Sequence, residues 1–269
     1  MLIDTHCHIQ FPQFDADRPA VFERARAAGV GRMVVVGADA QSSAAAMSLA
    51  AAHAQVTASA GIHPHRAALA GADECDRLRQ LVRQGPVAAI GEIGLDFYDR
   101  QTRRAEISAP ARQQQEWLFR EQLAIAVNSA LPVIVHCRQA HAALLAIIRE
   151  SAYRGLRGVM HCFSGDCAVL EASLSAGWFI SYAANITYPS AAALRDAVVR
   201  TPLERLLLES DAPYLAPQGG RGARNEPAAV KGLAIYIAEL KGIEPETVIA
   251  ATAENAGNLF GWTRAQEKR

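Results

Sequence analysis

The sequence has no long apolar run and no excess of charge of either sign. Its 27 basic and 27 acidic residues cancel, which argues against a protein that holds duplex nucleic acid mainly by neutralising phosphates. A protein that grips a strand end or a small anion is not excluded. No apolar stretch approaches the roughly 18 residues needed to span a membrane, so we expect no membrane association.

A targeting segment and a disulfide framework are also missing. The chain opens Met1-Leu2-Ile3-Asp4, without the basic start and apolar stretch of a signal peptide. The five cysteines are an odd number and lack paired spacing. This pattern favours a reducing compartment over a cross-linked secreted fold, so we expect a cytoplasmic protein.

What the sequence does contain is a regular alternation of short apolar runs and longer segments with helical period. Eight candidate strands lie at residues 2–6, 33–37, 57–62, 87–92, 132–136, 158–161, 178–183 and 205–209. Helical stretches between them include residues 18–28, 112–128, 139–150 and 166–176. Alternation of this kind predicts a parallel sheet, and eight units predict its closure.

We therefore predict an α/β fold, a single (β/α)8 TIM barrel over residues 1–261, followed by a polar tail at 262–269. An open, doubly wound sheet is the alternative. A closed barrel leaves no sheet edge to pair, which favours a monomer.

Six of the eight histidines lie at or just after the end of a predicted strand: His6, His8, His63, His65, His136 and His161. His53 and His141 fall on helices or loops instead. In a barrel the carboxyl ends of the strands converge on one face, where active sites are built. We expect the six to meet there.

Carboxylates follow the same strands. Glu92 closes an apolar run between glycines, and Glu209 and Asp211 follow the eighth strand with the same parity. Alternation along a strand points Glu209 into the barrel and Asp211 to its mouth. The expected ligand set for divalent ions is therefore His6, His8, Glu92, His136, His161 and Asp211.

Nitrogen and oxygen ligands in this ratio suit zinc, manganese or magnesium, and six donors suffice for two ions. Two such ions about 3.5–4 Å apart can activate a water.

Lysine is scarce, and its scarcity narrows the choice of bridging ligand. The chain has only Lys231, Lys241 and Lys268, all after the eighth strand. A carboxylated lysine, which bridges the metals of many barrel hydrolases, is thereby excluded. Glu92 is the carboxylate in the corresponding place.

Three cysteines, Cys7, Cys137 and Cys162, each follow a candidate ligand histidine by one residue. Strand alternation turns them away from the ligand direction. We expect small buried residues behind the site rather than additional ligands.

These segments resemble the TatD family of metal-dependent hydrolases, within the amidohydrolase-like barrels, and look most like its YjjV-type members. The resemblance covers nearly the whole chain, with these segments in the family's order: DTHCH, GIHPH, GEIGLD, VHCR, HCFSG, ITYP, ESDAPYL and RNEP. It implies His6, His8 and Asp211 on one metal, His136 and His161 on the other, and Glu92 between them. It also implies phosphodiester hydrolysis, with single-stranded DNA and 3′ ends preferred by some members.

Several residues near the expected site are candidate substrate contacts. The resemblance implies that His63 contacts substrate, and His65 either contacts substrate or stabilises its own loop. Arg138 suits a phosphate because its fork donates two hydrogen bonds, but a surface ion pair is equally compatible.

Two further groups stay open in the same way. Arg224 and Asn225 line a phosphate pocket or belong to a solvated loop. Asp96 and Glu209 are expected to orient either ligands or loops. Three aromatic residues either stack on a base or pack: Tyr98, Phe163 and Tyr188.

The leading hypothesis is a metal-dependent phosphodiesterase of the deoxyribonuclease type, acting on single-stranded DNA or 3′ ends as an exonuclease. Glu92 and Asp211 are its catalytic residues, with Asp211 either taking a proton from water or serving only as a ligand. The first alternative is a hydrolase of a small ester, lactone or cyclic amide, because fold and metal do not fix the substrate. The second is a non-catalytic metal-binding interaction protein.

Overall fold

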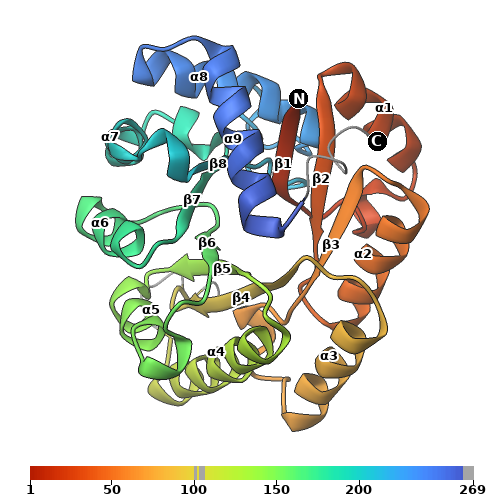
Figure 1. The fold of residues 1–269 in the computed structure, drawn as a ribbon, viewed down its shortest axis with the longest axis vertical. Helices are drawn as coiled ribbons and strands as arrows, with labels where there is room; N and C mark the ends of the chain where they lie inside the picture. Colours follow the sequence, from red (N-terminus) through yellow and green to blue (C-terminus); the bar gives the residue numbers. More distant parts are fainter. Residues whose placement is uncertain (100–101, 103–106, 263–269) are drawn as a thin grey trace.

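The computed structural model describes residues 1–99, 102 and 107–262 of the chain. Its eight strands are parallel and follow one another in chain order around the sheet (Figure 1). They are β1 Leu2–Cys7, β2 Val30–Val36, β3 Val56–Ala60, β4 Ala89–Asp96, β5 Val133–Arg138, β6 Gly158–Met160, β7 Phe179–Tyr182 and β8 Leu206–Leu208.

The first and last strands meet and close the barrel. Cys7 forms an isolated parallel bridge with Ala212, and the Thr5 hydroxyl donates to the carbonyl of Leu208 at 2.9 Å. The backbone N–H of Asp211 donates to the carbonyl of His6 at 2.9 Å. The predicted (β/α)8 barrel is confirmed, and the open sheet is wrong.

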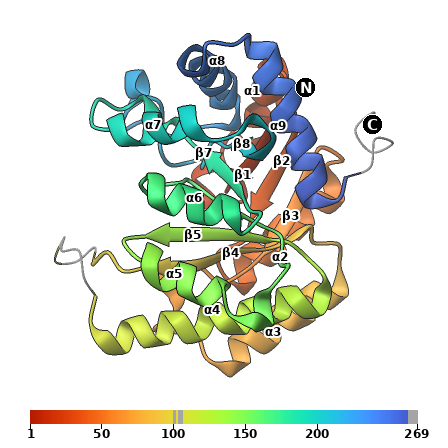
Figure 2. The ribbon, with the colours of Figure 1, turned by 60° about the vertical axis from the view of Figure 1, so that its left-hand side comes forward.

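Helices surround the sheet on the outside (Figures 1 and 2). They are α1 Arg18–Ala27, α2 Ala40–Ala52, α3 Ala72–Gln84, α4 Ala109–Ser129, α5 His141–Ile148, α6 Cys167–Ser175, α7 Ala192–Arg200, α8 Val230–Lys241 and α9 Pro245–Phe260. The strands between the barrel interior and this helical layer are buried on both faces, which explains their continuous Val and Ile runs.

The last helix, α9, plugs the barrel. Ala256, Leu259 and Phe260 pack into one buried cluster with the inward-facing residues of seven strands. These strand residues are Ile3, Val34, Val36, Ala89, Ile134, Val159, Phe179 and Leu207. A plug at one end leaves the carboxyl ends of the strands, at the other, for chemistry.

Strand β4 is longer than predicted and runs four residues past Glu92, to Asp96. The apolar run predicted a strand end at Glu92, with flanking glycines that permit close approach of backbone or ligand. In the structure Gly94 has a φ of 135°, and a Cβ there would lie 2.0 Å from the carbonyl oxygen of His136. Gly94 therefore permits a close approach of β5 inside the sheet. Gln115 of α4 holds the extension with 2.8 Å hydrogen bonds to the backbone N–H and C=O of Asp96.

The predicted domain boundary at residue 261 stays a prediction. Residues 263–269 of the expected tail, and residues 100–101 and 103–106, lie outside the described residues. Among the helices that the structure does describe, none combines the length and the apolar character needed to cross a bilayer.

Candidate active site

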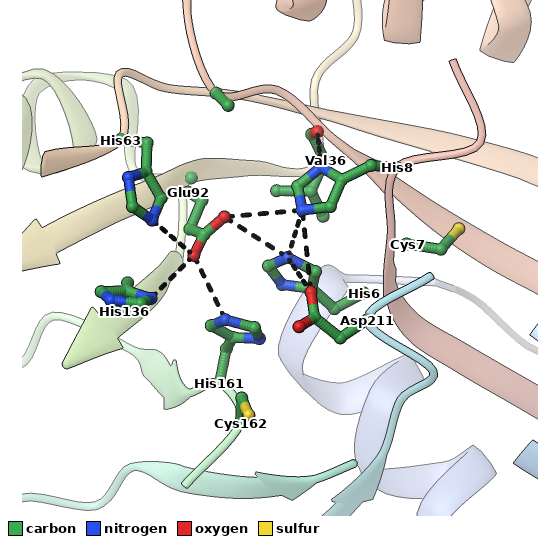
Figure 3. Close-up of polar contacts among 12 residues, drawn as sticks. His6, Cys7, His8, Val36, His63, Glu92, His136, His161, Cys162 and Asp211 are labelled. Atoms are coloured by element: carbon green, nitrogen blue, oxygen red, sulfur yellow. Dashed lines mark hydrogen bonds and ion pairs between the residues drawn. The ribbon is translucent and has the colours of Figure 1, made fainter. Parts of the chain in front are cut away.

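Four imidazoles, from β1, β5 and the segments that follow β1 and β6, surround Glu92 (Figure 3). Its Oε1 lies 3.0 Å from His136 Nδ1 and 3.2 Å from His161 Nε2. Its Oε2 lies 3.5 Å from His6 Nε2 and 3.6 Å from His8 Nε2. One carboxylate thus faces two pairs of imidazoles, one pair on each oxygen.

Asp211 joins the His6 and His8 side of the site. Its Oδ1 lies 3.8 Å from Nε2 of both histidines. The backbone of Asp211 has a φ of 53°, a left-handed conformation that aspartate tolerates better than most residues. Hydrogen bonds from its own N–H to His6 and from the Tyr214 N–H to its carbonyl hold that conformation. The structure therefore brings all six predicted ligands together.

The donor set fits divalent cations. Three groups have ligand atoms within 4.8 Å of one another: His6 with His8 and Glu92, His6 with His161 and Asp211, and His63 with Glu92 and His136. The two Nε2 atoms of His6 and His8 are only 3.1 Å apart. Since His8 Nδ1 donates to the carbonyl of Val36 at 2.8 Å, its Nε2 presents a lone pair to the site. A cation satisfies such converging lone pairs.

Two carboxylates orient ligand histidines from behind, as predicted. Glu209 Oε1 accepts from His161 Nδ1 at 2.8 Å and from the Cys162 N–H at 2.8 Å. Asp96 Oδ2 lies 3.2 Å from His136 Nε2. In each case the histidine nitrogen that points away from Glu92 donates its proton to the carboxylate behind it. The other nitrogen of the ring is thereby turned toward Glu92.

Burial and the neighbouring charges set the protonation of the site. Burial lowers the pKa of His8 to about 3, so this imidazole is neutral near pH 7. Burial also raises the pKa of Glu92, but His63, His161 and His136 outweigh it and hold that pKa well below the usual range. Burial holds the pKa of Asp211 well above its usual value. The centre is thus anionic at Glu92, next to a carboxyl that retains a proton more readily.

His63 differs from the other histidines around Glu92. Its Nε2 lies 3.3 Å from Glu92 Oε1, a distance that also permits a shared metal. Its Nδ1, however, accepts from the backbone N–H of His65 at 3.1 Å. Burial lowers the pKa of His63 to about 4, so the ring is neutral and carries its single proton on Nε2. His63 thus presents a hydrogen-bond donor to the site rather than a lone pair.

A pocket of about 590 Å³ opens above the cluster, and His65 and Arg138 line it together with His63. His65 Nε2 lies 2.7 Å from Asp96 Oδ2. The Arg138 guanidinium lies 3.9 Å from the centroid of the Tyr98 ring. Both basic side chains are therefore positioned at the pocket by a neighbour.

Arg224 and Asn225 are not among the residues that line this pocket, contrary to their predicted phosphate contact. Arg224 pairs with Asp17 at 2.7 Å and Glu226 at 2.8 Å, and its guanidinium lies over the Phe14 ring. Asn225 is buried and donates to the carbonyl of Ser210 at 2.7 Å. Their position after β8 suggested the mouth, but the loop turns them toward α1 and the barrel wall.

The cysteine prediction is right for Cys7, which is buried, and wrong for Cys162. β6 ends at Met160, and Cys162 has a φ of 43°, so strand alternation no longer applies there. Cys162 is partly exposed and lines the pocket. Cys137 is buried, yet it also contributes to the lining.

Of the two interpretations of the three aromatic residues, the structure supports packing. Phe163 is fully buried and packs edge-on against Tyr182. Tyr188 lies beneath Arg221 and donates its hydroxyl to the carbonyl of Ala216 at 2.8 Å. Tyr98 is covered by Arg138, so none of the three is a pocket-lining residue.

Among the lining residues that sequence reasoning missed are Phe11, Arg66 and Tyr214. Phe11 and Tyr214 each lie three residues after a predicted ligand, and Arg66 follows His65 directly. Their nearness to the strand ends was the available signal.

Comparison with known proteins places the chain among barrel hydrolases. The family model described as TatD related DNase matches residues 3–261. The uncharacterized metal-dependent hydrolase YabD of Bacillus subtilis is 36% identical, over 97% of this chain and 99% of its own length. The 3'-5' ssDNA/RNA exonuclease TatD of Erwinia amylovora is 38% identical, over 97% and 100%. The crystal structure of the TatD homolog YjjV from Escherichia coli K12 superposes with a TM-score of 0.90 at 33% identity, covering 97% of this chain and 98% of that one.

Proposed function

The chain belongs to the TatD family of metal-dependent hydrolases, and on that premise we propose that it hydrolyses phosphodiester bonds of DNA, preferring single strands and 3′ ends. The observation that carries the proposal is the cluster of four histidines and Asp211 around Glu92 at the mouth of a barrel. A relative that carries the name 3'-5' ssDNA/RNA exonuclease supports the choice of substrate.

Two divalent ions, zinc, manganese or magnesium, belong to this proposal. His6, His8 and Asp211 would hold one, His136 and His161 the other, with Glu92 shared between them. When bound, such ions supply Lewis-acid chemistry, which polarises a phosphodiester and makes water a stronger nucleophile near neutral pH.

Asp211 is the proposed proton acceptor. It lies at the mouth, and burial raises its pKa above the usual value, which makes its carboxylate a stronger base. Its side chain is 13% exposed, enough to reach an incoming water. The backbone N–H of Asp211 donates to the carbonyl of His6, and this hydrogen bond holds the residue beside His6 and His8.

His63, His65 and Arg138 are the proposed substrate contacts. His63 offers the N–H of its neutral imidazole to a phosphate oxygen. Arg138 adds a fixed positive charge, and its planar fork suits a phosphate. Arg224 and Asn225 are not proposed for this role, because their polar atoms are committed to other partners.

The setting we propose is the cytoplasm, and the working state a monomer. All five cysteines are unpaired, which supports a reducing compartment. The closed barrel leaves no free sheet edge for association.

A small ester or lactone is the second candidate substrate. A pocket of about 590 Å³ is within the range that holds a single small molecule, and the balanced charge of the chain does not demand a polyanion. The metal cluster would serve either substrate.

The test is the release of nucleotides from single-stranded DNA labelled at either end, using metal-reconstituted protein with Glu92→Gln beside it. Stepwise loss from the 3′ end by the wild type alone is the expected result. No cleavage with any of the three metals would contradict the proposal and favour the small-molecule hydrolase.

A further inference from the structure

The pocket above the metal cluster has two walls of different chemistry. Phe11, Tyr214 and Leu215 line it from the loops that follow β1 and β8. His65 and Arg66, after β3, and Arg138, at the end of β5, line it from elsewhere in the barrel. In the strand order β5 lies opposite the junction of β1 and β8, whereas β3 is two strands from β1. Arg138 therefore faces the aromatic wall across the site, and His65 and Arg66 lie on the rim between them.

The aromatic wall is attached to the ligand His8. The Phe11 ring lies parallel to the His8 imidazole, with centroids 4.7 Å apart and an angle of 9°. The Tyr214 ring meets the same imidazole edge-on at 6.2 Å. Backbone hydrogen bonds from Phe11 to His8 and from Tyr214 to Asp211 fix both loops to ligand residues. Tyr214 is nevertheless 50% exposed and lines the pocket, so part of its side chain is accessible at the rim.

The basic wall lies on the other side of Glu92. Figure 3 shows His63 and His136 across Glu92 from His8 and Asp211. The His65 ring lies 4.3 Å from that of His63, and Arg66 follows it in the chain. An ion pair of 3.0 Å with Asp39 positions Arg66 at this rim. Phosphate oxygens are therefore best accommodated on this side and aromatic groups on the His8 side.

We propose that Tyr214 and Phe11 form a base-binding subsite, in which the base on one side of the scissile phosphate stacks, while the rest of the phosphate chain leaves past Arg66 and Arg138. The inference rests on the proposed phosphodiesterase function and deepens it. Stacking on aromatic side chains is tolerant of base identity, since every base has a π-face. The subsite thus selects nucleotides over simple phosphodiesters without selecting a sequence, and Tyr214 is its specificity-determining residue.

The experiment compares three oligonucleotides: one intact, and two that each lack the base on one side of the scissile phosphate. Wild-type protein should lose about tenfold or more in kcat/KM for one of the two abasic substrates, as expected for one stacked base. Tyr214→Ala should abolish this preference, because it should slow only the substrates that keep the stacked base: the intact oligonucleotide and the other abasic one. Tyr214→Phe should retain the preference. Val199→Ala on α7, at a residue that is 52% exposed and absent from the pocket lining, is the matched control.

Equal turnover of all three substrates by the wild type would overturn the subsite. So would a Tyr214→Ala variant that slows every substrate by the same factor. If no oligonucleotide is cut with any metal, the phosphodiesterase proposal fails separately. The subsite is then tested by calorimetric binding of deoxyadenosine 5′-monophosphate and deoxyribose 5-phosphate to metal-loaded protein. A preference for the nucleotide that Tyr214→Ala removes supports the subsite, and equal binding of the two overturns it.

Discussion

The tautomer of each imidazole decides its role at the residue scale. His8, His136 and His161 each have an acceptor behind the ring, namely a carbonyl or a carboxylate. The nitrogen facing Glu92 is therefore the one that each of these three rings can offer to a metal ion. His63 has a donor behind its ring, the N–H of His65, and faces Glu92 with a proton. The same side chain at similar distances is thus a proposed ligand in three cases and a proposed hydrogen-bond donor in the fourth.

This difference predicts the metal content of two variants. His136→Ala should lose bound metal, because a bare nitrogen is removed from the Glu92 side of the site. His63→Ala should keep the metal content of the wild type and lower kcat/KM on phosphodiesters about tenfold to a hundredfold, as the loss of a charge-assisted donor does. Elemental analysis after dialysis, together with steady-state kinetics, distinguishes the two. Metal loss in His63→Ala would make His63 a ligand.

Asp211→Asn tests the proton acceptor. The amide keeps the shape of the side chain but cannot take a proton, so kcat should fall by about 10²–10⁴-fold with little change in KM. The metal content of the variant is measured alongside, because Asp211 is also a proposed ligand. An unchanged kcat would remove Asp211 from proton transfer.

Sequence reasoning identified residues well where strand alternation decides direction, and poorly where it stops. His6 and Glu92 lie within strands, and His8 and His161 come directly after β1 and β6. Cys162, one residue later, has a left-handed backbone that no pattern in the sequence announces. Arg224 faces away from the site because Asp17 and Glu226 attract it, and those partners come together only in the folded chain.

At the scale of elements, an ion-pair cluster ties α1 to the segment after β8. Its members are Asp17, Arg24, Arg224 and Glu226. Hydrogen bonds from Arg224 and Arg24 lower the pKa of Asp17, and hydrogen bonds from Arg24 lower that of Glu226. Since the folded-state pKa values lie below the unfolded ones, the cluster stabilises the fold above the unfolded values, about 3.9 and 4.3. That stabilisation is lost as the pH falls through the folded values.

We therefore expect Asp17→Asn to lower Tm at pH 7 and the difference from wild type to shrink steadily below about pH 4. Added salt should reduce it as well, because the cluster is exposed. Thermal unfolding followed by circular dichroism between pH 7 and pH 3 measures the effect. Asp196→Asn, on the exposed face of α7, is the control. A Tm difference that persists unchanged to pH 3 would mean that the ion pairs do not contribute.

Periodicity predicted all eight strands, because each is an apolar run between helical segments. Periodicity failed for the end of β4, because the strand continues past Glu92 and Gly94 allows β5 to approach it closely. Hydrogen bonds from Gln115, on a helix that follows in sequence, extend that strand. A contact between elements settles such a boundary, and a local pattern cannot.

At the scale of the whole molecule, α9 packs against the inward-facing strand residues and closes one end of the barrel interior. Leu259 is fully buried against the inward-facing strand residues. Leu259→Ala should reduce the free energy of unfolding by about 2–5 kcal/mol through lost burial and the cavity left behind. Urea unfolding measures the change, and Val199→Ala should cost less than about 0.5 kcal/mol. A loss below 1 kcal/mol would show that α9 is not integral to the core.

Closure of the barrel between β1 and β8 has a consequence for synthesis on the ribosome. His6 and His8 precede the other proposed ligands in the chain, while Asp211, hydrogen-bonded to the backbone of His6, follows all of them. The proposed ligand set can therefore assemble only after β8 has been translated and has closed on β1. A chain that stops before β8 cannot assemble it.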